Sequence, residues 1–386
     1  MFDDDLQQLE ERHLLRQLRL IESPTAAAVM IDGRSVILMA SNDYLGLATH
    51  PRLKQAAIAA TERFGVGAGA SRLVSGTLPP HRALEQALAA FKGTEAALLF
   101  GSGYLANIGL IPSLIGSGGT ILADRLCHAS LIDGGRLSGA DFHRYRHRDL
   151  DHLAALLSKH ATGRKTLIVT DGVFSMDGDL APLPALLGLA DRYDAMVLVD
   201  DAHGTGVMGA EGRGTLEHFG LESRLPFHMG TLSKALGGSG AYVAGPDTLI
   251  RYLVNRARSF IYTTAPPPAT AAAAQEALAV LRAEPERRAR LWRNRAQWHA
   301  GLRALGFRTT DTQSPIIPVL IGDPQQALTM AERLLQQGVY APAIRPPTVP
   351  PETSRIRTTV TAEHTVEQLD HALAAFKTVG AELGLL

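Results

Sequence analysis

The chain has 386 residues, of which 46% are hydrophobic and 20% charged, and its 38 Lys and Arg residues balance 38 Asp and Glu residues. A net charge of zero disfavours nucleic-acid binding driven by phosphate neutralisation, and it disfavours a polybasic membrane anchor. Cys127 is the only cysteine, which excludes an intrachain disulfide and a cysteine-based zinc site and favours a reducing compartment.

The start of the sequence carries no recognisable targeting signal. Its first residues, MFDDDLQQLEERH, are acidic and amphipathic rather than basic and apolar. No stretch reaches about 18 uninterrupted apolar residues, the length that a membrane-spanning helix needs. We therefore expect a soluble, cytoplasmic protein.

The N-terminal region predicts a helix followed by a hairpin. Leucines at positions 6, 9, 14 and 18 share one face of a helix over 3–20. The segment VMIDGRSVILMA then predicts two short strands around an Asp32-Gly33 turn. We expect residues 1–40 to form an N-terminal arm.

Strand and helix patterns alternate in the middle of the chain. Pro51 and Pro79 each begin a helical stretch, which ends at Gly65 in the first case and at Gly93 in the second. Short apolar runs follow that do not alternate with polar residues, as is typical of strands buried on both faces of a parallel sheet; they cover 96–100, 120–123, 165–170 and 195–200. This rhythm predicts a mostly parallel, doubly wound α/β sheet in a large domain over 41–284.

A second domain is predicted beyond a proline-rich break. After Ala-Pro-Pro-Pro at 265–268 comes a long helical region with an interruption at Pro285. Strand, helix, strand and helix patterns follow it. They predict a smaller C-terminal α/β domain over 285–386.

Lys234 stands out among the six lysines of the chain. It lies in the segment MGTLSKALGGSGAYVAG, where small and apolar neighbours offer no acidic partner and the glycines allow a ligand to approach closely. Desolvation there favours the neutral amine, which is the form that Schiff-base chemistry needs. The alternative is a lysine whose stem lies along apolar surface while its amine stays in water.

Polar residues follow the predicted strand at 195–200 directly. The segment VLVDDAHGTG places Asp200, Asp201 and His203 at the sheet edge where ligands of open α/β sheets bind. An aspartate there suits a metal ion, a helix cap or a pyridinium nitrogen. No HExxH or comparable spacing supplies further metal ligands, so we expect no metal site.

A third element is the segment LLFGSGYLANIGL, in which an apolar run ends in a Gly-Ser-Gly turn and a helix begins. Such a turn presents backbone N–H groups and the positive end of the helix dipole to an anion. A lysine, an aspartate and a helix N-terminus together match the aldehyde, the pyridine nitrogen and the phosphate of pyridoxal 5′-phosphate. Jointly, the three features favour this cofactor.

Motifs along nearly the whole chain resemble those of the α-oxoamine synthases, which are fold-type I pyridoxal-phosphate enzymes. The matching segments are SNDYLGL (41–47), SRLVSGT (71–77), GSGYLAN (101–107), HASLIDG (128–134), GVFSMDGDLAPL (172–183), VDDAHGTG (199–206), GTLSKALGG (230–238) and RPPTVPPETSRIR (345–357). The resemblance implies a fold-type I transferase with a mostly parallel doubly wound sheet and a smaller C-terminal α/β domain.

The resemblance also implies which residues hold the cofactor. Lys234 would bond to the cofactor aldehyde and later move the α-proton of the substrate, Asp200 would pair with the pyridine nitrogen, and His128 would stack on the ring. The other contacts would come from Gly103, Tyr104, Ser175, His203 and Thr231, together with Thr263 and Thr264 of the partner subunit in a homodimer with shared active sites.

For the substrate, the resemblance implies that Arg357 binds the amino-acid carboxylate, a task that suits a planar guanidinium. Further substrate-binding positions match Arg16, Asn42, His128, Arg345 and Thr348. The RPPTVP segment and Arg16 favour the family member that joins L-alanine to a pimeloyl thioester in biotin biosynthesis. Whether coenzyme A or an acyl-carrier protein carries the acyl group stays open.

Two other functions also stay open. Another α-oxoamine synthase would use glycine or serine with a different acyl-CoA. A non-catalytic pyridoxal-phosphate-binding module would serve regulation or assembly, although such a module has no need of a carboxylate-binding arginine beside the lysine, the aspartate and the histidine.

The stretch FHRYRHRD at 142–149 resembles a nucleic-acid contact, because arginines and histidines surround a tyrosine. In a chain of zero net charge, an edge strand and loop with a solvated face is the favoured interpretation. We therefore expect no nucleic-acid partner.

Overall fold

The computed structural model describes residues 2–12 and 14–386, which form two compact units. The small unit contains the chain up to Thr49, Met176–Asp179 and Glu286–Leu386. The large unit contains His50–Ser175 and Leu180–Pro285. The division into three domains made from the sequence stays a prediction.

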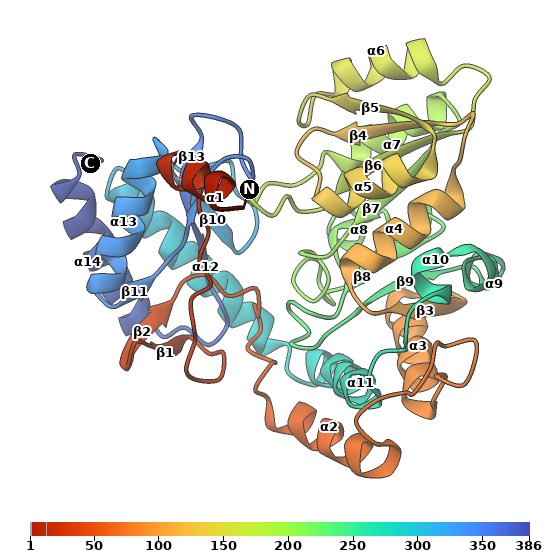
Figure 1. Ribbon diagram of the computed structural model, residues 1–386, viewed down its shortest axis with the longest axis horizontal. Coiled ribbons are helices and arrows are strands. Elements are labelled where there is room, and N and C mark those ends of the chain that lie inside the picture. The colour runs from red at the N-terminus through yellow and green to blue at the C-terminus, as the bar shows by residue number, and fades with distance from the viewer. Residues whose placement is uncertain (1, 13) are drawn as a thin grey trace. The chain divides into compact units, whose positions relative to one another are not determined.

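A seven-stranded sheet forms the centre of the large unit, in the order β3-β9-β8-β7-β6-β4-β5 (Figure 1). Its strands are β3 (Ala96–Phe100), β4 (Thr120–Asp124), β5 (Asp141–Tyr145), β6 (Thr166–Asp171), β7 (Met196–Asp200), β8 (His228–Thr231) and β9 (Ala241–Gly245). Neighbouring strands run parallel, except that β9 is antiparallel to both β8 and β3. The predicted mostly parallel sheet is confirmed.

Helices of the large unit begin and end where the sequence signals predict. Pro51 and Pro79 are each the first helical residue, and Gly65 and Gly93 follow the last one with positive φ angles of 80° and 69°. The helices are α2 (Pro51–Phe64), α3 (Pro79–Lys92), α4 (Gly103–Leu114), α5 (Ala129–Ser138), α6 (Leu150–His160), α7 (Leu183–Arg192), α8 (Thr215–His218), α9 (Asp247–Arg256), α10 (Arg258–Ile261) and α11 (Pro268–Ala283), with a 3₁₀ turn at Glu222–Arg224.

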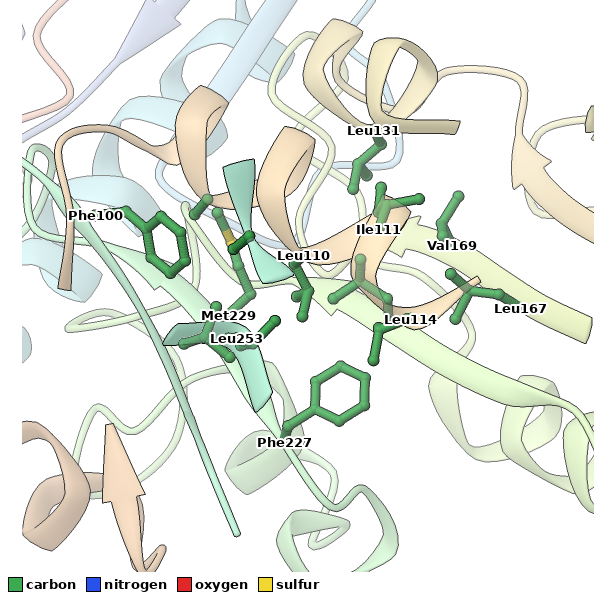
Figure 2. Close-up of a cluster of buried hydrophobic side chains, with 14 of the residues drawn as sticks. Phe100, Leu110, Ile111, Leu114, Leu131, Leu167, Val169, Phe227, Met229 and Leu253 are labelled. Carbon is green, nitrogen blue, oxygen red and sulfur yellow. The ribbon is translucent and has the colours of Figure 1, made fainter. Parts of the chain in front are cut away.

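Both faces of the sheet are covered, which explains the unbroken apolar runs in its strands. Leu167 and Val169 of β6 belong to a core cluster with α4, α5 and α9, whereas Ile168 between them belongs to a second cluster with α6 and α7. Alternate side chains of one strand therefore enter opposite cores. Figure 2 shows the first cluster, in which Leu110 and Ile111 of α4 lie among the strand side chains.

The strand at 141–145 lies at the edge of the sheet, as expected from the polar stretch around it. β5 pairs only with β4 in the described sheet. Its arginine side chains are engaged locally, since Arg144 donates to the carbonyl of Arg125 at 2.7 Å and Arg146 donates to Asp149 at 2.7 Å. The stretch is an edge strand and loop with a solvated face.

Two small sheets organise the small unit. One has the order β1-β2-β11, with β1 (Ala28–Ile31), β2 (Arg34–Leu38) and β11 (Val339–Tyr340); the other has the order β10-β13-β12, with β10 (Ile316–Gly322), β12 (Ala343–Ile344) and β13 (Ser354–Thr359). The helices are α1 (Phe2–Glu11), α12 (Glu286–Ala304), α13 (Pro324–Gln336) and α14 (Val366–Glu382). The predicted hairpin is confirmed, with Asp32 and Gly33 at φ angles of 50° and 68°.

The first helix is shorter than predicted. The leucine spacing predicts a helix over 3–20, but α1 ends at Glu11 and residues 14–20 form no regular element; residue 13 lies outside the described residues. No described residue of α1 is buried, and Leu18 is fully exposed. A helix of fewer than about 12–15 residues is marginal in water without packing. Leu6, Leu9 and Leu18 are exposed and only Leu14 is half-buried, so the leucine pattern did not suffice to extend the helix.

Two expectations from composition concern Cys127 and the membrane. The Cys127 thiol is buried, and burial raises its pKa well above the ordinary value, so it is held as an unreactive thiol. None of the helices in the described part of the chain is long and apolar enough to cross a membrane.

Replacing Leu167 with alanine tests how far the large unit depends on the core below α4. We expect the free energy of unfolding to fall by about 2–5 kcal/mol, because the change removes buried methyl groups and leaves a cavity. Ile58→Ala is the matched control, since Ile58 is 58% exposed and its loss should change stability by less than about 0.5 kcal/mol. Denaturant titration measures both, and equal effects would contradict this account of the core.

Candidate active site

Residues singled out for chemistry follow the carboxyl ends of neighbouring parallel strands in the large unit. His128 comes after β4, Ser175 after β6 and Asp200 ends β7, with His203 in the next turn. Lys234 follows β8 by three residues. Because parallel strands end at one edge of a sheet, the topology gathers these side chains there.

Asp200 is held by two hydrogen bonds at that edge. It is only 4% exposed. Its Oδ1 accepts a hydrogen bond from the N–H of Ala202 at 3.0 Å, and its Oδ2 accepts one from Nδ2 of Asn107 at 2.7 Å. Since a buried carboxylate is costly without such donors, the two bonds compensate its burial and fix its orientation.

His128 caps the N-terminus of α5 and leaves its ring exposed. Its Nδ1 accepts a hydrogen bond from the N–H of Ser130 at 3.2 Å and lies 2.7 Å from Ser130 Oγ. Partial desolvation lowers the pKa of His128; the negative charge of Asp200 opposes this effect, and the positive charge of Lys234 reinforces it. The ring is therefore neutral near pH 7.

Asp171 is a site residue that the sequence reasoning missed. It ends β6, is buried, and lies opposite Asp200 in the register of the two strands. Its Oδ2 accepts the N–H of His128 at 2.8 Å, which fixes the start of α5. Burial raises the pKa of Asp171 well above its ordinary value, and the charge of Asp200 acts in the same direction. The sequence did contain a signal for Asp171, because this aspartate comes at the end of an apolar strand segment, as Asp200 does.

Asn107 and Ser130 were also missed. Asn107 is fully buried on α4, and its Nδ2 lies 2.7 Å from Asp200 Oδ2 and 2.9 Å from Ser130 Oγ. One helical turn separates it from Gly103, so both lie on the same face of α4. That spacing is the signal that could have identified Asn107.

The glycine turn after β3 starts a regular helix, as predicted. Ser102 caps α4 by accepting the N–H of Leu105 at 3.2 Å, which leaves Gly103 and Tyr104 in its first turn. The Tyr104 ring is exposed, and its hydroxyl donates to Asp133 at 2.7 Å. The positive end of a twelve-residue helix thus borders the site.

Lys234 and Thr231 lie at the end of β8. Lys234 is half-buried, and its positive charge lowers the pKa values of both His128 and Asp171. Thr231 donates its hydroxyl hydrogen to the carbonyl of Gly240 at 2.9 Å, and its oxygen lies 2.8 Å from Ser233 Oγ. Two hydroxyl groups therefore sit side by side near the lysine.

Thr263 and Thr264 follow α10. Thr264 pairs with Ser71 in an isolated antiparallel bridge and is exposed. Thr263 lines a cavity of about 810 Å³ together with Leu105 of α4, Leu137 of α5 and Ile261 of α10. Their expected contact with the phosphate of a partner subunit stays a prediction.

A buried ion pair lies directly behind the site residues. Lys92 and Asp201 are both buried, and Nζ of Lys92 lies 3.7 Å from Oδ2 of Asp201. The Asp201 carboxylate also accepts the hydroxyl of Thr215 at 2.9 Å and its N–H at 3.1 Å. Gly204 and Gly214 pass so close that a Cβ on either would overlap Asp201 Oδ1 or Oδ2. The turn that holds His203 is therefore wound around this carboxylate.

In the small unit, Arg357 lies beside Asn42. Arg357 is 6% exposed on β13, and its Nη2 donates to Oδ1 of Asn42 at 3.1 Å. The hydroxyl of Tyr44 donates to the same oxygen at 3.3 Å. Burial raises the pKa of Tyr44 to about 12 although the charge of Arg357 opposes this. The structure thus brings together two residues that the resemblance assigned to the substrate.

Three more substrate-binding predictions, Arg16, Arg345 and Thr348, line one cavity of about 630 Å³ in the small unit. Arg16 Nη2 donates to Oγ1 of Thr348 at 3.0 Å, and Arg345 donates to the carbonyl of Leu15 at 3.4 Å. The rest of the lining includes the apolar residues Leu14, Leu328, Leu335, Ile344 and Pro346. The charged residues of the lining are the three arginines at positions 16, 19 and 345 and the two glutamates at positions 10 and 332, so the cavity combines an apolar wall with an excess of positive charge.

Some motif residues serve the scaffold instead. Arg72 of SRLVSGT is buried and forms a two-pronged ion pair with Glu85, with distances of 3.0 and 3.1 Å. Arg355, two residues before Arg357 on β13, pairs with Asp177 at 2.7 Å. Among the described residues, no cluster of three or more His, Cys, Asp or Glu side chains is arranged to hold a metal ion.

Comparison with known protein families identifies the family of this chain. The family model described as "Aminotransferase class I and II" matches residues 34–376. The chain belongs to the class I and II aminotransferase family. Relatives named 8-amino-7-oxononanoate synthase are similar over the full length, including one from Geobacter sulfurreducens, 52% identical over 385 residues, and one from Symbiobacterium thermophilum, 51% identical over 385 residues; each alignment covers 99% of this chain and 98% of the relative.

Solved structures with 28% to 35% sequence identity to this chain share its fold. A serine palmitoyltransferase from S. paucimobilis with bound PLP-myriocin aldimine matches with a TM-score of 0.95 and 35% identity, over 100% of this chain and 98% of that chain. An 8-amino-7-oxononanoate synthase from Francisella tularensis matches with a TM-score of 0.79 and 28% identity, over 91% of this chain and 99% of that chain. The predicted fold class is confirmed.

The buried Asp201 gives a pH dependence of stability that can be measured. Burial raises its pKa to about 6 from 3.8, with Lys92 opposing the shift, so folding favours the protonated carboxyl. The protonated carboxyl therefore contributes to the free energy of unfolding below about pH 4, and this contribution is lost as the pH rises to about 6. The loss is roughly 3 kcal/mol, because each unit of pKa difference corresponds to about 1.36 kcal/mol. Asp201→Asn removes the titration. The free energy of unfolding of the wild type minus that of the variant should therefore fall between pH 4 and 6, and a constant difference would refute the assignment.

Proposed function

We propose that this protein condenses L-alanine with a pimeloyl thioester to give 8-amino-7-oxononanoate, carbon dioxide and the free thiol, as a pyridoxal-phosphate-dependent acyltransferase of biotin biosynthesis. The observation that carries the proposal is the identity of about half of all residues, over nearly the full length, with 8-amino-7-oxononanoate synthases. The substrates themselves are part of the proposal.

The residues present fit pyridoxal 5′-phosphate. Lys234, Asp200 and His128 meet at one sheet edge next to the N-terminus of α4, so an amine, a carboxylate, an aromatic ring and an anion site are close together. The carbonyl oxygen Oδ1 of Asn107 is buried there without a hydrogen-bond partner among the described residues.

When bound, this cofactor accepts the electron pair of a bond broken at the α-carbon of the amino acid. The Nζ of Lys234 would hold the cofactor aldehyde until the amine of alanine replaces it. Lys234 would then remove the α-proton and later return one to the product. Lys234 is suited to both tasks, because it is half-buried beside groups of opposite and neutral charge.

Asp200 would keep a proton on the ring nitrogen, since its negative charge is fixed by the donors Ala202 and Asn107. His128 would stack against the ring with its exposed face. Ser175 and His203, in the turns after β6 and β7, would contact the remaining ring substituents.

The phosphate would lie at the start of α4, near the backbone N–H groups of Gly103 and Tyr104, with the hydroxyl of Thr231 as a further donor. Thr263 and Thr264 of the partner subunit would complete this contact in a homodimer.

We assign the protein to the cytoplasm. The single cysteine favours a reducing compartment, and the cytoplasm is such a compartment.

We assign recognition of the alanine carboxylate to Arg357, supported by its buried guanidinium and by Asn42 at 3.1 Å. The acyl group is assigned to the cavity with Arg16, Arg345 and Thr348, since its apolar wall suits a methylene chain and its arginines suit a distal carboxylate. Either coenzyme A or an acyl-carrier protein is compatible with this assignment.

Serine palmitoyltransferase activity is the second candidate, favoured by the TM-score of 0.95 to such an enzyme. Sequence identity favours the first candidate, with 52% against 35%. Two alternatives remain, condensation with glycine and cofactor binding without catalysis. The substrate panel described next distinguishes both of them from the two candidates.

A panel of amino acids and acyl thioesters separates these functions. We expect thiol release with L-alanine and pimeloyl thioesters, at a kcat/KM at least about 100-fold above that with glycine or serine, because the site must fit one methyl group and the distal carboxylate. Lys234→Ala is the control; it should release no thiol and should lose borohydride-dependent covalent attachment of the cofactor. Preference for serine with palmitoyl-CoA, or silence with every pair, would overturn the proposal.

Arg357 can be tested against its neighbour Arg355. Arg357→Lys keeps the charge but loses the planar fork, so KM for alanine should rise about 10-fold or more while KM for the thioester stays the same. Arg355→Lys, which weakens the pair with Asp177, should lower thermal stability without this selective change. Steady-state kinetics with each substrate varied decides, and identical KM effects of the two variants would exclude the assignment.

A further inference from the structure

Asn107, Ser130 and His128 form a chain of hydrogen bonds whose direction can be worked out from the partners. Asp200 is an acceptor at 2.7 Å from Asn107. The nitrogen of the Asn107 amide must therefore face Asp200, because the reverse orientation would place two acceptor oxygens against each other. The Nδ2 end of Asn107 is therefore the donor to Asp200.

The second N–H of Asn107 is used as well. Ser130 Oγ lies 2.9 Å from the same Nδ2, so the Ser130 hydroxyl accepts from Asn107. Its own hydrogen is then available for Nδ1 of His128, at 2.7 Å. The direction of the whole chain follows from the carboxylate at one end.

A second donor points at the same ring nitrogen. The backbone N–H of Ser130 lies 3.2 Å from Nδ1 of His128, and a backbone N–H can only donate. A proton on Nδ1 would face this N–H directly. The neutral ring of His128 must therefore carry its proton on Nε2.

We propose that Asn107 and Ser130 are positioning residues, which link Asp200 to His128 and hold His128 as the neutral tautomer with its proton on Nε2. The inference rests on the proposed function for its chemical meaning. In that setting, His128 offers one N–H donor to a substrate oxygen without placing a second positive charge beside Lys234.

The residue types agree with this task. A buried amide supplies two N–H donors and no charge, whereas aspartate would put a further carboxylate beside Asp171 and Asp200. Burial of both Asn107 and Ser130, each at 0% exposure, keeps water from replacing the bonds. Groups that face the His128 ring electrostatically are Asp200, Asp133 and Lys234.

The tautomer can be read from ¹⁵N NMR of histidine-labelled protein prepared without cofactor. His128→Gln identifies the signals of His128 among the 14 histidines. We expect a pyrrole-type Nε2 and a pyridine-type, hydrogen-bonded Nδ1 in the wild type. A proton on Nδ1 would overturn the proposal, whatever reaction the protein catalyses.

A double-mutant cycle tests the link itself. Ser130→Ala should move the Nδ1 signal toward that of a nitrogen without a hydrogen bond, and Asn107→Leu should move it in the same direction although Asn107 does not donate to His128. Because both act through one chain, the double variant should shift the signal less than the two single shifts added together. Additive shifts, or no shift with Asn107→Leu, would contradict the link.

Two further measurements connect the chain to the site. Asn107→Leu should weaken cofactor binding to the cofactor-free protein about 10-fold, as measured by fluorescence titration. Ser130→Ala should lower kcat about 5- to 10-fold with a smaller change in KM. Both effects have the size expected for the loss of one hydrogen bond. Ser130→Thr keeps the hydroxyl and should restore both the Nδ1 signal and kcat. If the NMR results hold and no condensation occurs, the proposed function fails while the hydrogen-bond chain stands.

Discussion

Two carboxyl groups, Asp171 and Asp200, are buried opposite each other at the ends of β6 and β7. Like charges so close in a desolvated place cannot both be stable without compensation. Burial and the charge of Asp200 raise the pKa of Asp171 well above its ordinary value, so the pair favours one negative charge. Hydrogen bonds from Asn107 and Ala202 compensate the burial of the Asp200 carboxylate. The rest of the site is arranged around this single charge.

Both the chain and its cofactor contribute groups that compensate the buried negative charge at the ends of β6 and β7. Lys234 brings positive charge to the same edge, and His128 remains neutral because desolvation and Lys234 lower its pKa. Lys92 and Asp201 form a separate buried pair behind the site. A protonated pyridine nitrogen is the kind of cation that a fixed carboxylate in this position would bind.

Part of this arrangement could be predicted from the sequence. Buried strands leave unbroken apolar runs, and ligands of such sheets bind at the carboxyl ends, so Asp200 could be found from local pattern, and the glycine-rich segment around Lys234 marked the lysine. The spacing of Asn107 from Gly103 marks its face of α4, but its hydrogen bond to Ser130 could not be predicted, because that bond depends on α4 and α5 packing side by side, which no local pattern encodes. The first helix was overestimated for a related reason, since leucine spacing does not say whether a packing surface exists. The roles of the site residues stay predictions.

The central claim is that Asp200 holds the cofactor through a charge pair with its ring nitrogen. The most direct measurement is the ¹⁵N chemical shift of pyridoxal 5′-phosphate labelled at that nitrogen and bound to the protein, compared between the wild type and Asp200→Asn. We expect a protonated nitrogen in the wild type and an unprotonated one in the variant. An unprotonated nitrogen in the wild type, or the same protonated signal in both, would contradict it.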